Sequence, residues 1–409
     1  MRNQNAKGLI RFIMFLCVII MFIVTLYACL DIFEIIDIPE QYSISNWLNN
    51  NFGKSYEIEY AISNSVEDGT QTITKRYVPH NETEDEPVVV ILPNEDNWNN
   101  FEVDKKQKDN SKNDDNTNNS NYNQNQFWYY DQLDEYAKKI YKELEKNLDN
   151  MKSGTYNIQF GKDFNDLLHE DGGEETLANS FQLAINALNF DNPEIFYIDI
   201  SKVYLLTKIT QKIWGTTYEV EIGASQGQSY LNDTFANRDD VDNAIRQIEQ
   251  EKVNIKLHLG SNVNDQIKTV HDYLVNNLEY DTTLSNSNIY NIYGALVNKK
   301  TVCEGYARAF KSMMDDLGIT CVIVCGTGVN SSGKTETHAW NYINLDGNWY
   351  AIDVTWDDPI IIGNGYVSKD IFYKYYLKGS EEFFENHTED GAIVDGAHFV
   401  YPTLSRTDY

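Results

Sequence analysis

Residues 301–307 read TVCEGYA, residues 338–341 read HAWN and residues 349–357 read WYAIDVTWD. In that order they hold a thiol, an imidazole and a carboxylate. A thiol nucleophile, a histidine base and a carboxylate that orients the histidine make up a Cys-His-Asp site. The stretch therefore predicts nucleophilic catalysis by a cysteine.

The thiol, Cys303, is expected in the first turn of a helix. Thr301 and Glu304 fit a capping box, and Gly318 fits the position just after the helix ends. The free N–H groups and the positive dipole of a helix N-terminus favour an anion, so they favour a reactive thiolate. The cap predicts an activated Cys303.

A hairpin is expected to bring His338 and Asp353 together. An Asp-Gly pair at residues 346–347 is a signal for a two-residue turn, which would pair Leu345 with Asn348. Asp353 is then the diagonal neighbour of His338 on one face, ~7–8 Å away at Cα. A change of one residue in the loop would turn Asp353 to the other face.

The three motifs together resemble the core motifs of the transglutaminase-like superfamily, in its bacterial branch, and the resemblance extends over residues 240–400. It implies a fold similar to papain-like thiol proteases, in which a helix bearing the cysteine packs on an antiparallel sheet. It also implies that Cys303 is the nucleophile, His338 the general base and later the acid, and Asp353 the group that orients the histidine.

Other features of the site stay open. The backbone N–H of Cys303 and the side chain of Tyr293 are candidates for the oxyanion donors. No acidic cluster has the spacing of the calcium sites of animal transglutaminases, so neither a metal nor a cofactor is expected. Three tryptophans either line a substrate groove or fill the hairpin core: Trp340, Trp349 and Trp356. Three histidines outside the motifs are expected to be structural: His271, His387 and His398.

Composition excludes some classes of partner. The formal net charge is −29, from 33 basic and 62 acidic side chains, which argues against nucleic acid because phosphate binding needs a basic face. The five cysteines give no disulfide framework. Cys321 and Cys325 share a strand-like run that separates them by ~13 Å, so they cannot bridge each other and are expected to be packing residues.

The N-terminal segment Phe12–Leu30 has no charged residue. As a helix it would be ~28 Å long, close to the ~30 Å hydrocarbon core of a bilayer. Arg2, Lys7 and Arg11 precede it, so the positive-inside rule places the rest of the chain outside the cytoplasm. A single-pass anchor, a cleaved signal peptide and a lipoprotein modified at Cys29 are the three interpretations, and all give that location.

The chain is expected to be α+β and divided into successive regions. These are a cytoplasmic N-terminus with its anchor at 1–37, a small β-rich or stalk region at 38–100, an Asn/Asp-rich linker at 101–126, an α+β accessory region at 127–237 and the catalytic domain at 238–409.

The sequence thus predicts a membrane-anchored extracytoplasmic thiol enzyme. It would form an acyl-enzyme on peptide or amide substrates of the cell envelope and hydrolyse it, as a protease or amidase does. Two alternatives remain: a transglutaminase that passes the acyl group to an amine, and a non-catalytic surface or scaffold protein.

Overall fold

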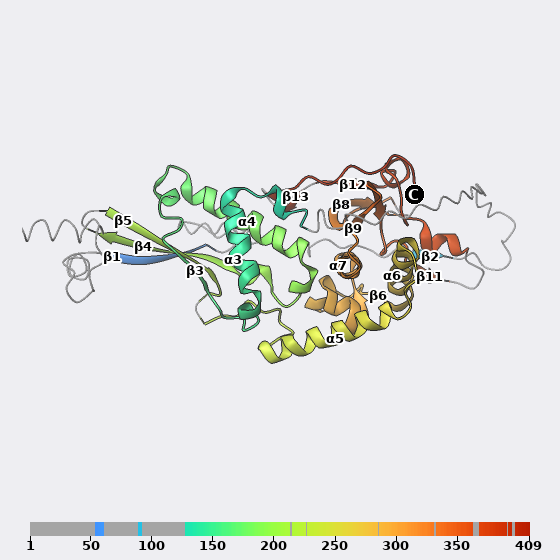
Figure 1. Cartoon of the computed structure of the whole chain (residues 1–409), viewed down its shortest axis with the longest axis horizontal. Coiled ribbons are helices and arrows are strands. Elements are labelled where there is room, and N and C mark those ends of the chain that lie inside the picture. The colour runs from blue at the N-terminus through green and yellow to red at the C-terminus, as the bar shows by residue number, and fades with distance from the viewer. Residues whose placement is uncertain are drawn as a thin grey trace, which may run out of the picture. The chain divides into compact units, whose positions relative to one another are not determined.

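The computed structural model describes residues 54–60, 89–91, 127–212, 215–225, 227–284, 286–330, 333–362, 368–390, 392–394 and 397–409. They belong to two compact units (Figure 1). The first contains residues 159–173 and 206–221 with the strand segment before residue 60, and the second contains most of the remainder, including all three motifs.

The first unit is built around a β-sheet with the strand order β1-β4-β5-β3. Its strands are β1 (Lys54–Tyr60), β3 (Ile158–Gly161), β4 (Tyr204–Lys212) and β5 (Gly215–Gly223). Together with the helices around them, these strands fit the α+β character expected for residues 127–237. Buried and exposed residues alternate along β3, as expected for a sheet with one covered face.

Helices dominate the second unit. They are α3 (Glu135–Met151), α4 (Gly173–Asp191), α5 (Arg238–Lys256), α6 (Val263–Asn277), α7 (Cys303–Asp316) and the short α8 (Ser380–Phe383). Asp134, Asn237 and Asn262 each accept a backbone N–H at the start of α3, α5 and α6, respectively. These residue types are preferred N-caps because they satisfy donors that lack a partner in the first turn.

The central sheet of this unit is antiparallel, with the strand order β10-β9-β8-β12. Its strands are β8 (Cys321–Val329), β9 (Thr335–Leu345), β10 (Asn348–Ile352) and β12 (His387–Glu389). Helix α7 lies beside β8 and β9 in Figure 1, and the Asn341 amide donates to the Ala307 carbonyl at 3.0 Å. A cysteine-bearing helix on an antiparallel sheet is the core that the sequence predicts.

The hairpin between β9 and β10 has the predicted register. Leu345 pairs with Asn348, and the two turn residues Asp346 and Gly347 have φ values of 52° and 85°. Positive φ at both central positions gives the twist that neighbouring strands need. The register therefore puts Asp353, just after β10, on the same face as His338.

Shorter elements complete the unit. Parallel pairs join β6 (Glu279–Tyr280) to β7 (Lys300–Thr301) and β11 (Ile360–Ile362) to β2 (Val89–Ile91), and β13 (Ala392–Val394) pairs with β14 (Ala397–His398). Between α6 and α7 lie the 3₁₀-helix η8 (Ser287–Tyr290) and the π-helical turn η9 (Gly294–Asn298).

Helix α7 is the centre of the core. Phe310, Met313 and Met314 are fully buried, and Gly318 follows the helix with a φ of 70°. The N–H of Ile319 reaches the Met314 carbonyl at 2.9 Å, which completes the Schellman motif expected at this glycine. Cys321 and Cys325 are buried and unbridged, as predicted, and burial raises the pKa of both thiols.

The N-terminal predictions fall largely outside the described residues. Phe12–Leu30, Cys29 and the linker at 101–126 all lie in parts of the chain that the structure does not describe. Within the described residues, no helix has both the length and the apolar character needed to cross a membrane.

Candidate active site

Cys303 lies in the first turn of α7, as the sequence predicts, and is its first residue, but the predicted capping box is wrong. The N-cap is Val302, and no side chain caps the helix. Thr301 belongs to strand β7, and its hydroxyl donates to the Ile289 carbonyl at 2.6 Å. Glu304 instead accepts from the Arg308 guanidinium at 2.9 Å. Pairing of β7 with β6 engages Thr301, so the threonine cannot also serve the helix.

Close backbone packing holds the start of α7 in place. The Val302 N–H donates to the Ile289 carbonyl at 3.0 Å. A Cβ on Gly305 would lie 1.7 Å from the Thr301 hydroxyl oxygen, so only glycine fits there. Cys303 is buried, with 8% of its surface exposed. The thiol is thus carried by a helix terminus that is fixed from outside the helix.

His338 and Asp353 meet as the hairpin predicts. The Nε2 of His338, on β9, lies 2.7 Å from Oδ2 of Asp353, and both side chains are fully buried. A carboxylate accepts but does not donate, so His338 carries its proton on Nε2 in this pair. Its Nδ1 is then the ring nitrogen that can accept a proton, which is the tautomer that a histidine base needs.

Asp353 uses both of its oxygens. Oδ1 accepts the backbone N–H groups of Thr355 and Trp356 at 3.0 and 3.1 Å, and Oδ2 faces two histidines. Burial alone would raise the pKa of Asp353, but the charge of His338 and the bonds from both histidines lower it below its ordinary value. The carboxylate is therefore ionised and held in one orientation.

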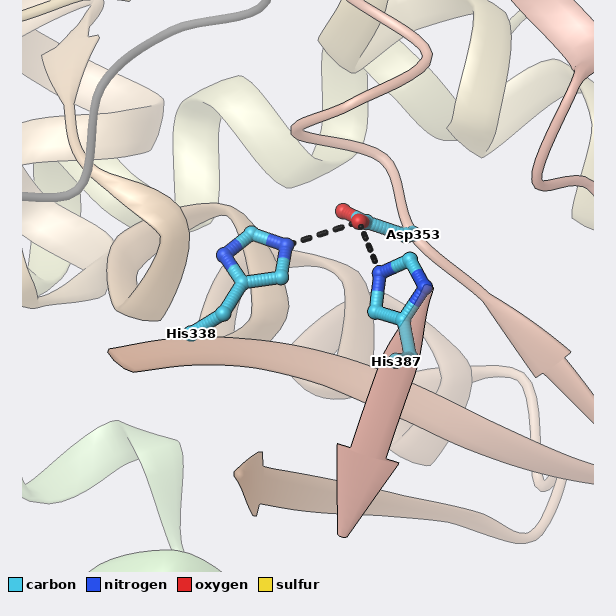
Figure 2. Close-up of side chains that lie close together, drawn as sticks. All are labelled: His338, Asp353 and His387. Carbon is cyan, nitrogen blue, oxygen red and sulfur yellow. Dashed lines mark hydrogen bonds and ion pairs between the residues drawn. The ribbon is translucent and has the colours of Figure 1, made fainter. Parts of the chain in front are cut away.

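The second histidine on Asp353 is His387, which the sequence analysis takes as structural. Its Nε2 lies 3.0 Å from Oδ2 of Asp353, and Figure 2 shows the two rings approaching the carboxylate from different sides. His387 starts β12, which pairs with β8 through Gly328. No short sequence motif links His387 to Asp353. Its place in the site could have been predicted only from the pairing of β12 with β8.

Two tryptophans form the wall behind the histidines. Trp356 stacks on His338 with ring centroids 4.8 Å apart, and Trp340 lies 5.8 Å from the same ring. Both indoles are buried, so packing, one of the two alternatives, is confirmed for them. Trp349 packs edge-on against Trp128 at 5.5 Å. The wall keeps the His338–Asp353 pair away from water.

The other predicted candidates lie apart from this cluster. The Tyr293 hydroxyl donates to Gln247 at 3.1 Å, so it already has a partner other than a substrate oxyanion. His271 is buried between Asp272 and Asp357, at 3.2 and 3.0 Å, which confirms it as a packed histidine. His398 is exposed at the end of β14.

A cavity of about 160 Å³ opens beside the first turns of α7. Its lining includes Glu304 and Arg308 of this helix and Tyr290 and Asn291 of the preceding turn. Arg308 also donates to the carbonyl of Asn189, another lining residue, at 2.7 Å. Most of its lining residues are polar, but Cys303, His338 and Asp353 are not among them.

Comparison with known proteins agrees with this arrangement. Residues 253–354 match the sequence profile of the Transglutaminase-like superfamily, and the matched range includes Cys303, His338 and Asp353. The chain carries a transglutaminase-like domain. The match confirms the resemblance to this superfamily that the three motifs predict, over residues 253–354.

The individual relatives are distant from this chain. Kyphoscoliosis peptidase of Mus musculus is 28% identical over 163 residues, which are 34% of this chain and 24% of that protein. The chain thus spans about a quarter of the length of this curated relative. Its human counterpart is 28% identical over 140 residues, or 21% of its length.

Several solved structures are similar to part of this chain. One is described as a TGase, with 17% identity, a TM-score of 0.26 and coverage of 37% of this chain and 44% of that one. Another is a candidate cysteine protease of Cytophaga hutchinsonii, with 18% identity, a TM-score of 0.23 and coverage of 36% and 54%. The family assignment rests on the motifs and on the match over residues 253–354.

Proposed function

We propose that this protein is a thiol enzyme in which Cys303 is the nucleophile, His338 the general base and acid, and Asp353 the orienting carboxylate. The observation that carries the proposal is the buried 2.7 Å contact between His338 and Asp353 in a domain whose central helix begins with Cys303. A cysteine at a helix N-terminus, with a histidine held in one tautomer by a carboxylate, is the arrangement that thiol catalysis requires.

The reaction would proceed in two steps. The Cys303 thiol passes its proton to Nδ1 of His338, and the thiolate attacks the carbonyl carbon of a peptide or amide bond. The C–N bond breaks, His338 returns the proton to the departing amine, and an acyl-enzyme remains on Cys303. Water, activated by His338, then releases the acid and restores the thiol.

Hydrolysis is the favoured outcome, and transfer of the acyl group to a primary amine is the alternative. Kyphoscoliosis peptidase, a relative by sequence, is named for cleavage, whereas a TGase is among the similar structures. Incubation of the chain with a glutamine-containing peptide and a biotin-labelled primary amine separates the two. Free acid or ammonia without biotin incorporation supports hydrolysis, and biotinylated peptide supports transfer.

We also propose that the domain acts outside the cytoplasm on peptides or proteins of the cell envelope. The uncharged segment Phe12–Leu30, preceded by Arg2, Lys7 and Arg11, supports a membrane anchor, with a cleaved signal peptide or a lipid on Cys29 as alternatives. The net charge of −29 gives no support to a nucleic-acid partner. Protease protection of the intact chain in spheroplasts tests the orientation.

The activated thiol is tested by alkylation with iodoacetamide between pH 4 and 10, read for the Cys303 peptide by mass spectrometry. The full chain should react well below pH ~8.5, the pKa of an ordinary thiol, and His338→Ala should restore an ordinary profile. An ordinary profile in both proteins would overturn the proposal. A non-catalytic surface role would instead be supported if Cys303→Ala restored every phenotype of a deletion strain.

A further inference from the structure

His387 reaches the proposed site from a different strand. On β8, Gly328 pairs with His387 and Gly326 pairs with His338, so the two histidines project from the same face of the sheet. Their Nε2 atoms lie 3.0 and 2.7 Å from the same carboxylate oxygen, Oδ2 of Asp353 (Figure 2). One acceptor atom therefore serves two buried imidazoles.

Together with two backbone N–H groups, these two contacts occupy every acceptor position of the Asp353 carboxylate. An ionised carboxylate has about four acceptor positions, two on each oxygen. The backbone N–H groups of Thr355 and Trp356 take those of Oδ1, and the two Nε2–H groups take those of Oδ2. With all four positions in use, Asp353 has no alternative orientation of similar energy. His387 supplies one of the two bonds that fix the oxygen facing His338.

The surroundings of His387 suit a neutral donor. Burial lowers the pKa of His387, and it outweighs the opposing hydrogen bond to Asp353, while the charge of His338 lowers the pKa further. Nδ1 lies 2.9 Å from the side-chain oxygen of Asn386, whose amide nitrogen lies 2.8 Å from the Tyr375 hydroxyl. A half-turn of this amide gives Nδ1 a donor and lets Tyr375 donate to the amide oxygen.

The remaining neighbours of His387 are mainly aromatic rings, together with the backbone of Phe383, whose hydrogen bond opposes the lowering of the His387 pKa but is outweighed by burial. Phe383 of α8 stacks on the ring, with centroids 4.0 Å apart, and Trp356 lies 4.5 Å away. His387 itself is 1% exposed. Asp353 is therefore the carboxylate that His387 faces at hydrogen-bond distance, and His338 is the other titratable ring in the cluster.

We propose that His387 is a positioning residue of the thiol site, which donates the second N–H to Oδ2 of Asp353 and fixes this carboxylate against His338. The neutral state of His387 leaves the imidazolium charge of the reaction to His338. The inference rests on the proposed function of Cys303, His338 and Asp353.

A metal ion is the competing explanation for this cluster. Ligand atoms of His338, Asp353 and His387 lie within 4.8 Å of one another. Around a tetrahedral zinc with bonds of ~2.0 Å, however, ligand atoms would be ~3.3 Å apart. The 2.7 and 3.0 Å contacts are hydrogen-bond distances. The geometry therefore points to a shared proton acceptor.

Two substitutions separate the N–H donor from the ring. His387→Gln keeps a side-chain donor, and His387→Leu keeps a similar volume without one. At pH 6, His387→Leu should lower the rate of Cys303 alkylation by roughly 10- to 100-fold, the loss expected for a hydrogen bond to a charged group. Because the buried carboxylate loses a donor, the acid limb of the profile should also move to higher pH.

The controls distinguish positioning from a general structural effect. His387→Gln should stay within about threefold of the wild-type rate and keep its acid limb. His271→Gln removes another fully buried histidine that bonds a carboxylate, and it should lower the unfolding temperature without moving the Cys303 profile. Equal losses in His387→Gln and His387→Leu, no loss in either, or the same shift in His271→Gln would overturn the proposal.

A measurement on the unaltered full chain does not depend on the folding of variants. Histidine-selective ¹⁵N NMR should show His387 as the neutral Nε2–H tautomer throughout pH 5–8. A cationic His387, the Nδ1–H tautomer, or a stoichiometric metal that is lost in His387→Leu would overturn the proposal. If Cys303 reacted with the pH profile of an ordinary thiol and this profile did not change in His338→Ala, the proposed function would be wrong. The NMR result would still decide the protonation state of His387.

Discussion

Asp353 determines what the histidines of this site can do. Its fully buried carboxylate accepts two backbone N–H groups and two imidazole N–H groups, and it stays ionised because these donors outweigh the effect of burial. An isolated carboxylate in such a place would be protonated. The acceptor-only state of Asp353 in turn fixes the tautomer of His338.

Asp353→Asn should therefore damage the site although it preserves shape. An amide has one acceptor oxygen, so its NH₂ group must face either the imidazole or the backbone donors. We expect Cys303 alkylation at pH 6 to fall roughly 10- to 1000-fold and the unfolding free energy to fall by about 3 kcal/mol, since hydrogen bonds to a buried charged group are lost and a donor is left without an acceptor. Iodoacetamide kinetics and urea unfolding measure the two effects.

Asp358→Asn is the matched control for this substitution. Burial raises the pKa of Asp358 to about 7, and this carboxyl accepts from the Tyr306 hydroxyl at 2.6 Å. It is therefore mostly neutral at pH 6, and an amide mimics it. A control that loses as much reactivity as Asp353→Asn would show that the site responds to any nearby acid-to-amide change.

Local sequence patterns predicted most of the candidate site, but not all of it. His338 and Asp353 could be predicted because a two-residue turn and a side-chain period of two determine their relative position. His387 could not, because its place depends on a pairing between β12 and β8 that no adjacent residues encode. When a polar side chain comes from a distant strand, no fixed sequence spacing relates it to the rest of the site.

At the scale of elements, the start of α7 depends on its surroundings more than on its own sequence. Val302 offers no side-chain cap, and strand β7, which ends at Thr301, leads directly into the helix. The predicted capping box fails because the Thr301 hydroxyl bonds to the Ile289 carbonyl. At the other end, Gly318 terminates the helix as predicted, since a glycine with positive φ acts through its own backbone.

Gly305→Ala tests this close packing. In an exposed helix the change stabilises by about 1 kcal/mol. Here the new Cβ would lie 1.7 Å from the Thr301 hydroxyl oxygen and 2.6 Å from the Ile289 carbonyl oxygen. We expect a loss of roughly 1–3 kcal/mol in unfolding free energy and a slower Cys303 alkylation, because the first turn must move.

Gly215→Ala provides the comparison, because a Cβ there would meet nothing within 4 Å. It should change the unfolding free energy by less than ~0.5 kcal/mol and leave Cys303 unaffected. If Gly305→Ala proved as stable as the wild type, the tight contact with Thr301 would not constrain the helix.

At the scale of the whole unit, residues just before α3 form hydrogen bonds with segments far along the chain. Trp128 donates to the Val400 carbonyl at 2.8 Å, and the Tyr129 hydroxyl donates to the Ile323 carbonyl on β8. Asp191, at the end of α4, accepts the N–H groups of Tyr129 and Tyr130 at 3.1 and 2.9 Å. The boundary predicted at residue 238 is based on composition and periodicity. Neither of these reveals hydrogen bonds between residues so far apart in the sequence.

The carboxyl group of Asp191 also makes the stability of the folded chain depend on pH. Burial raises the pKa of Asp191 to about 7, although the N–H groups of Tyr129 and Tyr130 act in the opposite direction. Between pH ~4 and ~7 the folded chain keeps a proton on Asp191 that the unfolded chain has lost, so stability falls as pH rises. Asp315, whose pKa burial raises to about 6, adds to this trend. We expect the unfolding free energy to be on the order of 2 kcal/mol lower at pH 8 than at pH 5.5 for Asp191 alone.

Asp191→Asn isolates this contribution, because the net charge of −29 also favours mildly acidic conditions through reduced repulsion. In urea titrations at several pH values, the variant should lose about half or more of the wild-type dependence between pH 5.5 and 8. The exposed Asp171→Asn removes the same formal charge and should retain that dependence. Below pH ~4 the trend should reverse in all three proteins, since the lowered pKa of Asp353 makes acid remove stability there. Parallel curves for Asp191→Asn and Asp171→Asn would show that Asp191 is ionised in the folded chain at pH 5.5, and that its two backbone donors outweigh its burial.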